Sequence, residues 1–484
     1  MINWRITLRL LAFPIIWMGT VQLIFSTLSL FIFKDRVIAS FLIPGLTMLT
    51  TGLLILVNLN KANLSAASFR DALIYATVTW AIAGTLGALP IVFITGVSFT
   101  DGVFESISAL TTTGATILSG LDNMPPTFLL YRQFLQWMGG LGIVIFVVAI
   151  LPMLNVGGMK LLKAETPGPI KDEKLTPRVA STAHYLWGVY LVITVLCTLA
   201  YYAGGMSFYD AIAHAFTTVS TGGFSTHDAS MWFYQSHLLL WISNLFMIAG
   251  AINFGLHFRV AYKKSIGSYY NDEETRYFIY IILFLSVLVA ALLLLNETYT
   301  NTLEAFSFAT FHIVSFITST GYGSASFTEW PAVTGTILVI AGYLGGCAGS
   351  TAGGNKIIRN VIVAKIINKN IKQLLHPRAI FTIKYQDIPV KDDILHAIMA
   401  FMTFAATSSL LFTLMLMATG LDFWSAFTAV AACVNVLGPG FGEVGANFQP
   451  VSDTGTWILS VAMIVGRLEY FTVFALFTHS FWKK

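Results

Sequence analysis

Ten apolar segments, nine of them about as long as a bilayer is thick and one visibly broken, leave this chain little choice of fold. A helix needs about 20 mostly apolar residues to cross a bilayer. Charged residues make up 10% of the 484 residues and apolar ones 56%, whereas soluble domains are roughly a quarter charged. The sequence therefore predicts an all-α polytopic membrane protein. The predicted spans are Leu8–Phe33, Ile38–Val57, Ala72–Thr95, Phe128–Leu154, Val179–Ala203, His237–Tyr262, Tyr277–Leu295, a broken one at Val333–Gly345, Ile394–Thr419 and Trp457–Phe481.

Four shorter segments lie between these spans, and each is followed by a polar strip that contains glycine. A helix of about 12 residues is too short to cross, and in lipid non-helical backbone persists only where protein buries it or where it lines a watery cavity. We therefore interpret the segments as re-entrant helices. They run from Asp101 to Thr113, Phe208 to Thr221, Thr302 to Thr320 and Asp422 to Leu437.

These pieces form one unit of span, re-entrant helix, strip and span, which occurs four times after an initial helix pair. The second spans support the repeat, because a glycine recurs midway along each. Aligning Trp137, Met247, Tyr343 and Ile464 places Gly250 level with Gly140. The prediction is a helix pair at residues 1–70, followed by four repeats at residues 71–178, 179–274, 275–390 and 391–484 around a central pore.

The strips offer hydroxyl and carbonyl oxygens without a fixed charge, since none contains Asp or Glu. Carbonyl rings suit a monovalent cation, and the C-terminal ends of re-entrant helices also favour a cation. We expect potassium as the ion. In the fourth strip the filter glycine is Gly438 or Gly440, with Gly438 favoured. The candidate ligands are Thr112, Thr113 and Gly114; Ser220, Thr221 and Gly222; Ser319, Thr320 and Gly321; and Asn435, Val436, Leu437 and Gly438.

Basic residues predict the orientation of the chain. If both termini are cytoplasmic, nearly all Lys and Arg fall in cytoplasmic loops, and only Lys34, Arg36 and Arg132 lie outside. Such asymmetry is the usual sign of topology in membrane proteins. It places all four strips on the outer side of the membrane. The longest basic segment, from Arg359 to Lys391, could also dock a cytosolic partner.

The second span of the third repeat is interrupted by a glycine-rich stretch at residues 345–356, which should break the helix. A phosphate-binding loop would need Gly-Lys followed by Ser or Thr, but residues 354–357 read Gly-Asn-Lys-Ile. Arg467 in the fourth repeat is expected to face this stretch and bind its carbonyls, or to pair with a local carboxylate. Lys356 either acts together with this glycine-rich stretch or anchors the chain at the membrane surface.

Acidic residues near the starts of the re-entrant helices are expected to be helix caps, with attraction of cations as a second role. They are Asp101, Glu105, Asp210, Glu304 and Asp422. The histidines show no paired spacing typical of a metal site.

The fourfold unit, the extra helix pair and strips of the Thr-Thr-Gly, Ser-Thr-Gly, Ser-Thr-Gly and Leu-Gly-Pro-Gly kind resemble the Trk/Ktr/HKT superfamily of potassium transporters. The resemblance implies uptake of K⁺, and of Rb⁺, across the bacterial cytoplasmic membrane. Glycine at position 114 is similar to the potassium-selective members, whereas sodium-preferring plant relatives often have serine there. It further implies that the glycine-rich stretch is an intramembrane loop that obstructs permeation, with Gly345, Gly346, Gly349, Gly353, Gly354, Lys356 and Arg467 as gate residues.

The resemblance also implies partners. These are a second copy of the chain in a homodimer, each with its own pore, and a cytosolic ring of TrkA-type subunits. ATP, ADP or NAD(H) would bind to that ring only, and no covalent cofactor or nucleic acid is expected.

Two other classes of function remain as alternatives. A sodium- or proton-coupled secondary transporter of another small solute would predict inverted repeats with a midplane site, whereas these repeats share one orientation. A membrane enzyme would need a nucleophile, a base or a metal cluster, and the sequence offers none, so we expect no enzymatic activity.

Overall fold

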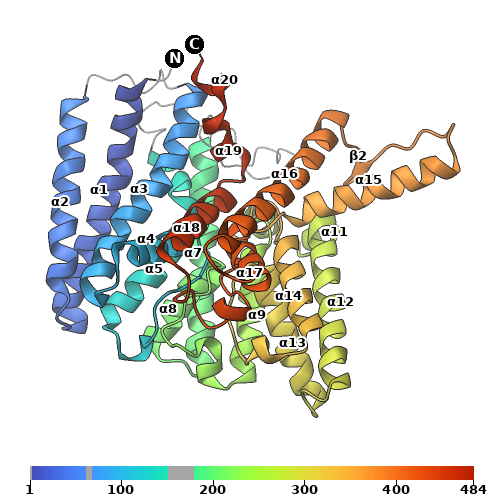
Figure 1. Ribbon diagram of the computed structural model, residues 1–484, viewed down its shortest axis with the longest axis horizontal. Coiled ribbons are helices and arrows are strands. Elements are labelled where there is room, and N and C mark those ends of the chain that lie inside the picture. Colours follow the sequence, from blue (N-terminus) through green and yellow to red (C-terminus); the bar gives the residue numbers. More distant parts are fainter. Residues whose placement is uncertain (1–2, 61–67, 151–178, 484) are drawn as a thin grey trace.

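Membrane-length helices dominate the protein, and the computed structural model describes residues 3–60, 68–150 and 179–483 (Figure 1). Within these ranges, six helices are long and apolar enough to cross a membrane, or eight if two bent helix pairs are counted as spans. The all-α polytopic fold expected from the sequence is confirmed. Part of the span predicted at Phe128–Leu154, and the basic residues from Lys160 to Arg178, lie outside the described residues.

The chain opens with a helix pair and continues as four successive units. The pair is α1 (Trp4–Leu28), extended by a π-helical turn at Ser29–Phe33, and α2 (Ile38–Asn58). The units contain α3 (Phe69–Thr95), α4 (Phe99–Leu110) and α5 (Pro126–Ile150); α7 (Val179–Ala203), α8 (Phe208–Val219), α9 (His237–Ala251) and α10 (Phe254–Lys263); α12 (Glu273–Leu295), α13 (Thr302–Ile317), α14 (Ala332–Leu344) and α15 (Ile357–Leu375); and α16 (Asp392–Met417), α17 (Phe423–Val434) and α18 (Asp453–Arg467).

Short elements complete the chain between and after these helices. They are α11 (Gly267–Asn271), the antiparallel strands β1 (Lys384–Tyr385) and β2 (Ile388–Pro389), α19 (Phe471–Phe474) and α20 (His479–Trp482), together with 3-10 turns at Leu121–Asn123, Ser230–Tyr234, Phe327–Glu329, Gly442–Val444 and Ala475–Phe477. In Figure 1 the two termini lie at the same end of the molecule, while α15 extends sideways from the helix bundle.

None of the four predicted second spans is straight: α5 is kinked at Gly142, and the other three are broken. The helices α9 and α10 meet at 95°, because Ile252 is extended and the Asn253 side chain accepts hydrogen bonds from Gly255 and Leu256 to start a new helix. The helices α18 and α19 meet at 107°, where Glu469 and Tyr470 have positive φ. In the third unit, the glycine-rich stretch separates α14 from α15 as expected.

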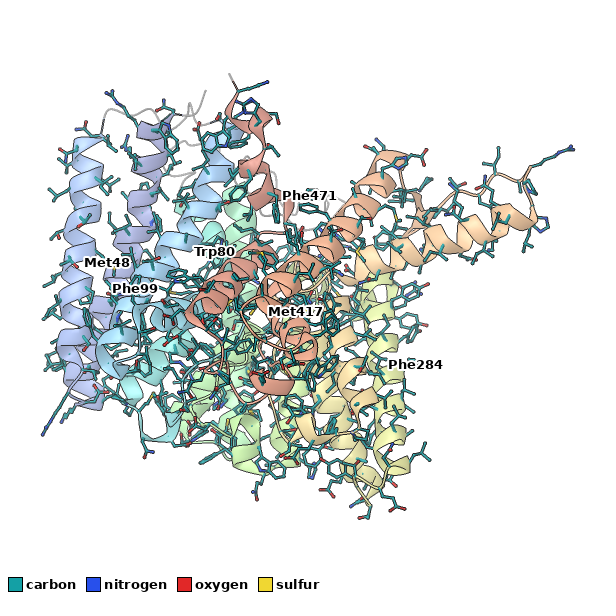
Figure 2. All side chains as sticks on the ribbon, viewed as in Figure 1. Met48, Trp80, Phe99, Phe284, Met417 and Phe471 are labelled. Atoms are coloured by element: carbon teal, nitrogen blue, oxygen red, sulfur yellow. The ribbon has the colours of Figure 1, made fainter. Side chains whose placement is uncertain are left out.

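The outer surface of the bundle is apolar, as contact with lipid requires. On α12, Leu283, Phe284 and Val287 are more than half exposed, and Figure 2 shows Phe284 on the outside of the molecule. Inside, buried apolar side chains form two large clusters, one mainly from α1–α5 with α16–α18 and the other mainly from α7–α14. The polar strips belong to the loops between helices of these two clusters.

The four re-entrant helices are each capped by a polar side chain at the N-terminus. Ser98, Ser207, Asn301 and Asp422 accept hydrogen bonds from backbone N–H groups of the first turn. Asp101, Asp210 and Glu304 lie in the first turn, where a carboxylate is stabilised by the helix dipole. The expected capping role is therefore confirmed for Asp422, and the first-turn position for these three acids.

Candidate ion-binding site

The four strips share one backbone conformation. A residue with positive φ is followed two positions later by a glycine with positive φ in every strip: Thr112 and Gly114, Thr221 and Gly223, Ser319 and Gly321, Val436 and Gly438. The residue between them donates its N–H to the carbonyl five positions earlier, as Thr113 does to Ser108 at 2.8 Å and Thr320 to Ser315 at 2.8 Å. This common geometry sets the register of the four strips independently of residue type.

The register corrects one detail of the second strip. Gly223, rather than Gly222, is equivalent to Gly114, because α8 ends at Val219 and Ser220 takes the place that Thr111 has after α4. Gly222 then corresponds to Thr113. In the fourth strip Gly438 has φ of 100° and is the equivalent glycine, while Gly440 has no positive φ.

The equivalent glycines connect the strips into a closed ring. A Cβ atom at Gly114 would lie less than 3.0 Å from the carbonyl oxygen of Gly222 in the second strip. The same relation joins Gly223 to Thr320, Gly321 to Leu437, and Gly438 back to Thr113. Each glycine therefore makes room for a carbonyl of the next unit, and the last unit closes on the first. Glycine is required at these positions both by the positive φ and by this close approach.

The ring is buried and contains no charged side chain. Thr112, Thr113, Ser220, Thr221, Ser319, Thr320 and Asn435 are all at most 1% exposed. Hydroxyl pairs stiffen two strips, with Thr111 and Thr113 2.8 Å apart and Thr318 and Thr320 2.7 Å apart. Because carbonyl and hydroxyl oxygens can replace the water shell of a cation without adding a charge, this arrangement is suited to a monovalent ion. Among the described residues, no group of three His, Cys, Asp or Glu could hold a metal.

The glycine-rich loop between α14 and α15 contacts three of the strips. The Thr351 hydroxyl donates to the carbonyls of Val219 at 3.1 Å and Gly250 at 2.9 Å, and it lies 3.3 Å from the Thr221 hydroxyl. The N–H of Gly353 donates to the Ser319 hydroxyl. A Cβ at Gly353 would lie less than 3.0 Å from the Asn435 carbonyl. The loop is thus packed directly against the strips of units two, three and four.

Backbone hydrogen bonds and one buried carboxylate hold both ends of the loop. Cys347 donates to Ala251 at 2.9 Å and Ile357 to Gly346 at 3.0 Å. Oε1 of Glu274 accepts from Ala348 at 2.8 Å and from Ile358 at 3.0 Å. Gly345, Gly349 and Gly354 have positive φ.

Lys356 is buried, and its ammonium donates to the Ala352 carbonyl inside the loop. It therefore belongs to the loop and is not an anchor at the membrane surface.

Arg467 bridges the loop and the first unit. Its guanidinium donates to the carbonyls of Thr351 at 3.0 Å and Gly140 at 3.0 Å, and also to that of Gly139. The expected contact with loop carbonyls is confirmed. The nearby carboxylate of Glu469 instead pairs with Arg359 at 2.6 Å.

Glu105 is not a helix cap, which corrects the expectation from sequence. It lies in the middle of α4 and is 1% exposed, as is its partner Arg132. Arg132 Nε donates to the carboxylate at 2.9 Å, and Thr116 and Ile117, just after the first strip, also donate to it. The guanidinium lies 4.1 Å from the centre of the Phe224 ring. Arg132 thus supports the first and second strips. Because it is buried beside Glu105, its charge is not an indicator of membrane topology.

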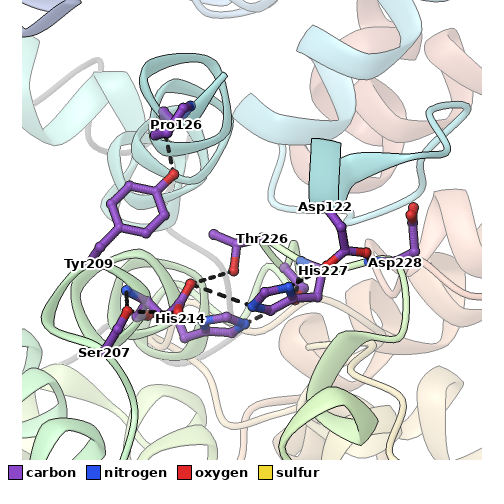
Figure 3. A network of polar contacts seen from close by, with 10 residues as sticks. Asp122, Pro126, Ser207, Tyr209, His214, Thr226, His227 and Asp228 are labelled. Carbon is purple, nitrogen blue, oxygen red and sulfur yellow. Dashed lines mark hydrogen bonds and ion pairs between the residues drawn. The ribbon is translucent and has the colours of Figure 1, made fainter. Parts of the chain in front are cut away.

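A polar network joins the first two units outside the strips (Figure 3). His227 bonds the Asp122 carboxylate through Nδ1, and its Nε2 lies 3.7 Å from Asp210. Asp228 accepts a hydrogen bond from the N–H of Leu121 at 3.0 Å. Burial opposes a charge on the imidazole, but the hydrogen bond to Asp122 and the negative charges of Asp210 and Asp122 outweigh it and raise the pKa of His227 above 6.5.

The second spans also take a register that differs from the hand alignment. Gly139, Gly250, Gly345 and Gly466 each stand thirteen residues after the first residue of their helix. A Cβ at Gly139, Gly250 or Gly466 would lie less than 3.0 Å from the last carbonyl of the re-entrant helix in the same unit. Gly250 is therefore level with Gly139, and not with Gly140. The glycines let span and re-entrant helix approach closely.

Three residues that contact the site were not singled out from the sequence. Thr351 stands among the loop glycines, Glu274 near the start of α12, and Gln136 in α5. A signal was present for two of them, since a carboxylate or an amide in an apolar span requires a polar partner. The identity of those partners depends on the fold.

Comparison with known proteins identifies relatives along nearly the whole chain. A family model described as TrkH, a cation transport protein, matches residues 45–484. The Trk system potassium uptake protein TrkH of Vibrio parahaemolyticus is 43% identical over 428 residues, which cover 88% of either chain. TrkH of Halomonas elongata is 41% identical over 99% of either chain. The crystal structure of the potassium transporter TrkH from Vibrio parahaemolyticus superposes with a TM-score of 0.90 at 38% identity and covers 100% of both chains.

Proposed function

The chain belongs to the TrkH family of cation transport proteins, and we propose that it takes up potassium through the ring of strip carbonyls. The ion loses its water shell to carbonyl and hydroxyl oxygens of all four units. The potassium-uptake names of relatives more than 40% identical support potassium as the substrate, and Rb⁺, of similar size, follows the same path.

One observation carries the assignment of the filter. The carbonyls of Thr113, Gly222, Thr320 and Leu437 each lie against a glycine of the neighbouring unit, in a cycle that closes on itself. That four units of different sequence keep two positive φ positions and this contact supports one common purpose for these oxygens. Coordination of an ion between the four units is such a purpose.

The loop at residues 345–356 is the proposed gate. It contacts three strips, and its glycines, three of which have positive φ, allow its backbone more than one conformation. Gly345, Gly346, Gly349, Gly353 and Gly354 provide this freedom. Lys356 and Arg467 hold the loop through its own carbonyls. Release of these hydrogen bonds would open the path.

The setting of the protein is proposed on the basis of the family. The chain lies in the cytoplasmic membrane with both termini inside, in agreement with the asymmetry of its basic residues. It forms a homodimer and assembles with a cytosolic ring of TrkA-type subunits, which bind ATP, ADP or NAD(H). The relatives are named as members of a Trk system, which supports a separate partner.

Selective flux in liposomes tests the filter. In Gly114→Ser, the new side chain enters the space of the Gly222 carbonyl, so the preference for K⁺ and Rb⁺ over Na⁺ should fall by about tenfold, or roughly 1.4 kcal/mol of discrimination. Gly96→Ser is the matched control, because Gly96 also has positive φ but no atom within 4 Å of a Cβ. An unchanged preference in Gly114→Ser would contradict the filter.

A further inference from the structure

Gln136 occupies the space that a side chain at Gly222 would need. Its Nε2 donates to the Gly222 carbonyl at 2.7 Å, and its Oε1 accepts from the N–H of Phe224 at 3.1 Å. Gln136 is fully buried. A Cβ at Gly222 would lie 2.5 Å from Gln136 Oε1. The side-chain amide of Gln136, in the first unit, therefore bonds the second strip at the residues before and after Gly223. One of these bonds is to a ring oxygen.

The same helix position is filled differently in the other units. Gln136, Met247, Gly342 and Met463 all stand ten residues after the first residue of their helices, and among them Gln136 alone carries an amide. In the third unit the helix has the small residue and the strip of the next unit has the large one. Gly342 leaves room for Leu437 of the fourth strip, whose Cδ2 would lie 2.7 Å from a Cβ at Gly342.

The second strip also lacks the hydrogen bond between two hydroxyl groups that stiffens the first and third strips. Thr113 and Thr320 hold their strips through hydroxyl pairs with Thr111 and Thr318. Gly222, at the equivalent position, has no hydroxyl. Gln136 instead holds this strip from the neighbouring unit, donating to the Gly222 carbonyl and accepting from the N–H of Phe224.

We propose that Gln136 is a specificity-determining residue that positions the Gly222 carbonyl within the ring. The inference rests on the proposed potassium filter. Fixed positions of the four oxygens are one source of discrimination between K⁺ and Na⁺, because a strip that moves inward also accommodates the smaller ion. Gln136 acts on the ion through the backbone of the next unit, and it is a positioning residue.

The test compares two variants of Gln136 with a control at the same helix position. Gln136→Met keeps the volume but loses both hydrogen bonds, and Gln136→Glu keeps an acceptor for Phe224 while its carboxylate cannot donate to Gly222. Both should lower the flux ratio of K⁺ to Na⁺ in liposomes by about fivefold to tenfold. Met463→Leu, a change of similar volume in the fourth unit, should leave the ratio unchanged.

A second measurement applies to the purified protein in detergent. The K⁺ concentration that gives half-maximal protection against heat should rise in both Gln136 variants, with little change for Na⁺, and stay constant in Met463→Leu. A side chain that only fills space predicts wild-type values for Gln136→Met in both assays, and that result would overturn the inference.

Gly114→Ser in the same assays separates the inference from the proposed function. If Gly114→Ser lowers the flux ratio and neither Gln136 variant does, the filter stands and the role of Gln136 fails. If none of these variants changes the ratio, both fail.

Discussion

At the scale of residues, the ring depends on single glycines. Each of them has a positive φ and lies against a carbonyl oxygen of the neighbouring unit. At most positions in a protein, one methyl group is a small change. At Gly438, with φ of 100° and the Thr113 carbonyl against it, it adds a strain of about 1–2 kcal/mol and displaces an oxygen of the ring.

The two glycines of the fourth strip give a matched pair of variants. Gly438→Ala should reduce K⁺ flux by tenfold or more and lower the preference over Na⁺, because its Cβ displaces the Thr113 carbonyl. Gly440→Ala should have a smaller effect, since its Cβ meets the side chain of Val444, which can shift. Isotope flux in liposomes, at equal amounts of folded protein, measures both. Equal losses in the two variants would contradict the assignment of Gly438.

Arg467 allows a prediction about the gate. Arg467→Ala removes the hydrogen bonds to Thr351, Gly139 and Gly140, so the loop loses its tie to the first unit. Basal K⁺ flux in the absence of any partner should rise severalfold. Lys365→Ala serves as the control for loss of a charge, because the partners of Lys365, Glu273 and the Lys384 carbonyl, lie outside the loop and the strips. Wild-type flux in Arg467→Ala would assign that residue to structure alone.

At the scale of elements, contacts between successive units recur at several levels. The helix α5 of the first unit supports the second strip through Gln136 and through Arg132 beneath Phe224. Tyr322 of the third strip lies 3.1 Å from the Thr218 hydroxyl on α8 and donates to the His214 carbonyl. The second and third strips are therefore held in part by a neighbouring unit, which couples the ring to the packing of its helices.

The network around His227 predicts a dependence on pH. A raised pKa means that the protonated imidazole stabilises the fold below its usual pKa of 6.5, and that this stabilisation is lost as pH rises through the raised pKa. Hydrogen bonds to His227 outweigh burial and lower the pKa of Asp122 below 3.8, so its contribution is present above 3.8 and lost as pH falls through the lowered pKa. The network is therefore strongest between about pH 4 and 6.5.

The measurement is the melting temperature of the protein as pH is raised from 6 to 9. Wild type should lose stability over this range, and His227→Gln should lose less. Other groups near the imidazole are His214, whose ring centroid is 6.5 Å away, and Tyr234, at 5.7 Å, besides Asp210 and Asp122. His237→Gln is the control, because His237 bonds Ser307 and no carboxylate. Identical pH profiles for wild type and His227→Gln would rule out this origin.

At the scale of the whole molecule, the ring predicts that the transported ion stabilises the fold. An ion that binds only the folded protein stabilises it by about 2.7 kcal/mol at a hundredfold excess over Kd. K⁺ and Rb⁺ should therefore raise the melting temperature more than Na⁺ at equal ionic strength. Gly438→Ala should abolish the difference between K⁺ and Na⁺. A wild-type protein that melts at the same temperature in all three salts would contradict an ion site in the ring.

The fold could be predicted from the sequence because hydrophobic length and a repeated unit are local properties. The strips were found for the same reason, as polar residues in an apolar chain. Their exact register was not, because Gly222 and Gly223 are adjacent and only the end of α8 distinguishes them. Glu105 was misread because its position near a helix start is local, while its partner Arg132 is 27 residues away in the chain. Contacts between units, such as those of Gln136 and Glu274, leave no pattern in a single sequence.

The closure of the ring also has a consequence for how the protein is made. A ribosome delivers the first unit well before the fourth, and domains generally form in the order of synthesis. Gly438 meets Thr113 only after almost the entire chain has been inserted. The ion site is consequently among the last features to be assembled, and a chain cut short before its fourth strip would reach the membrane without one.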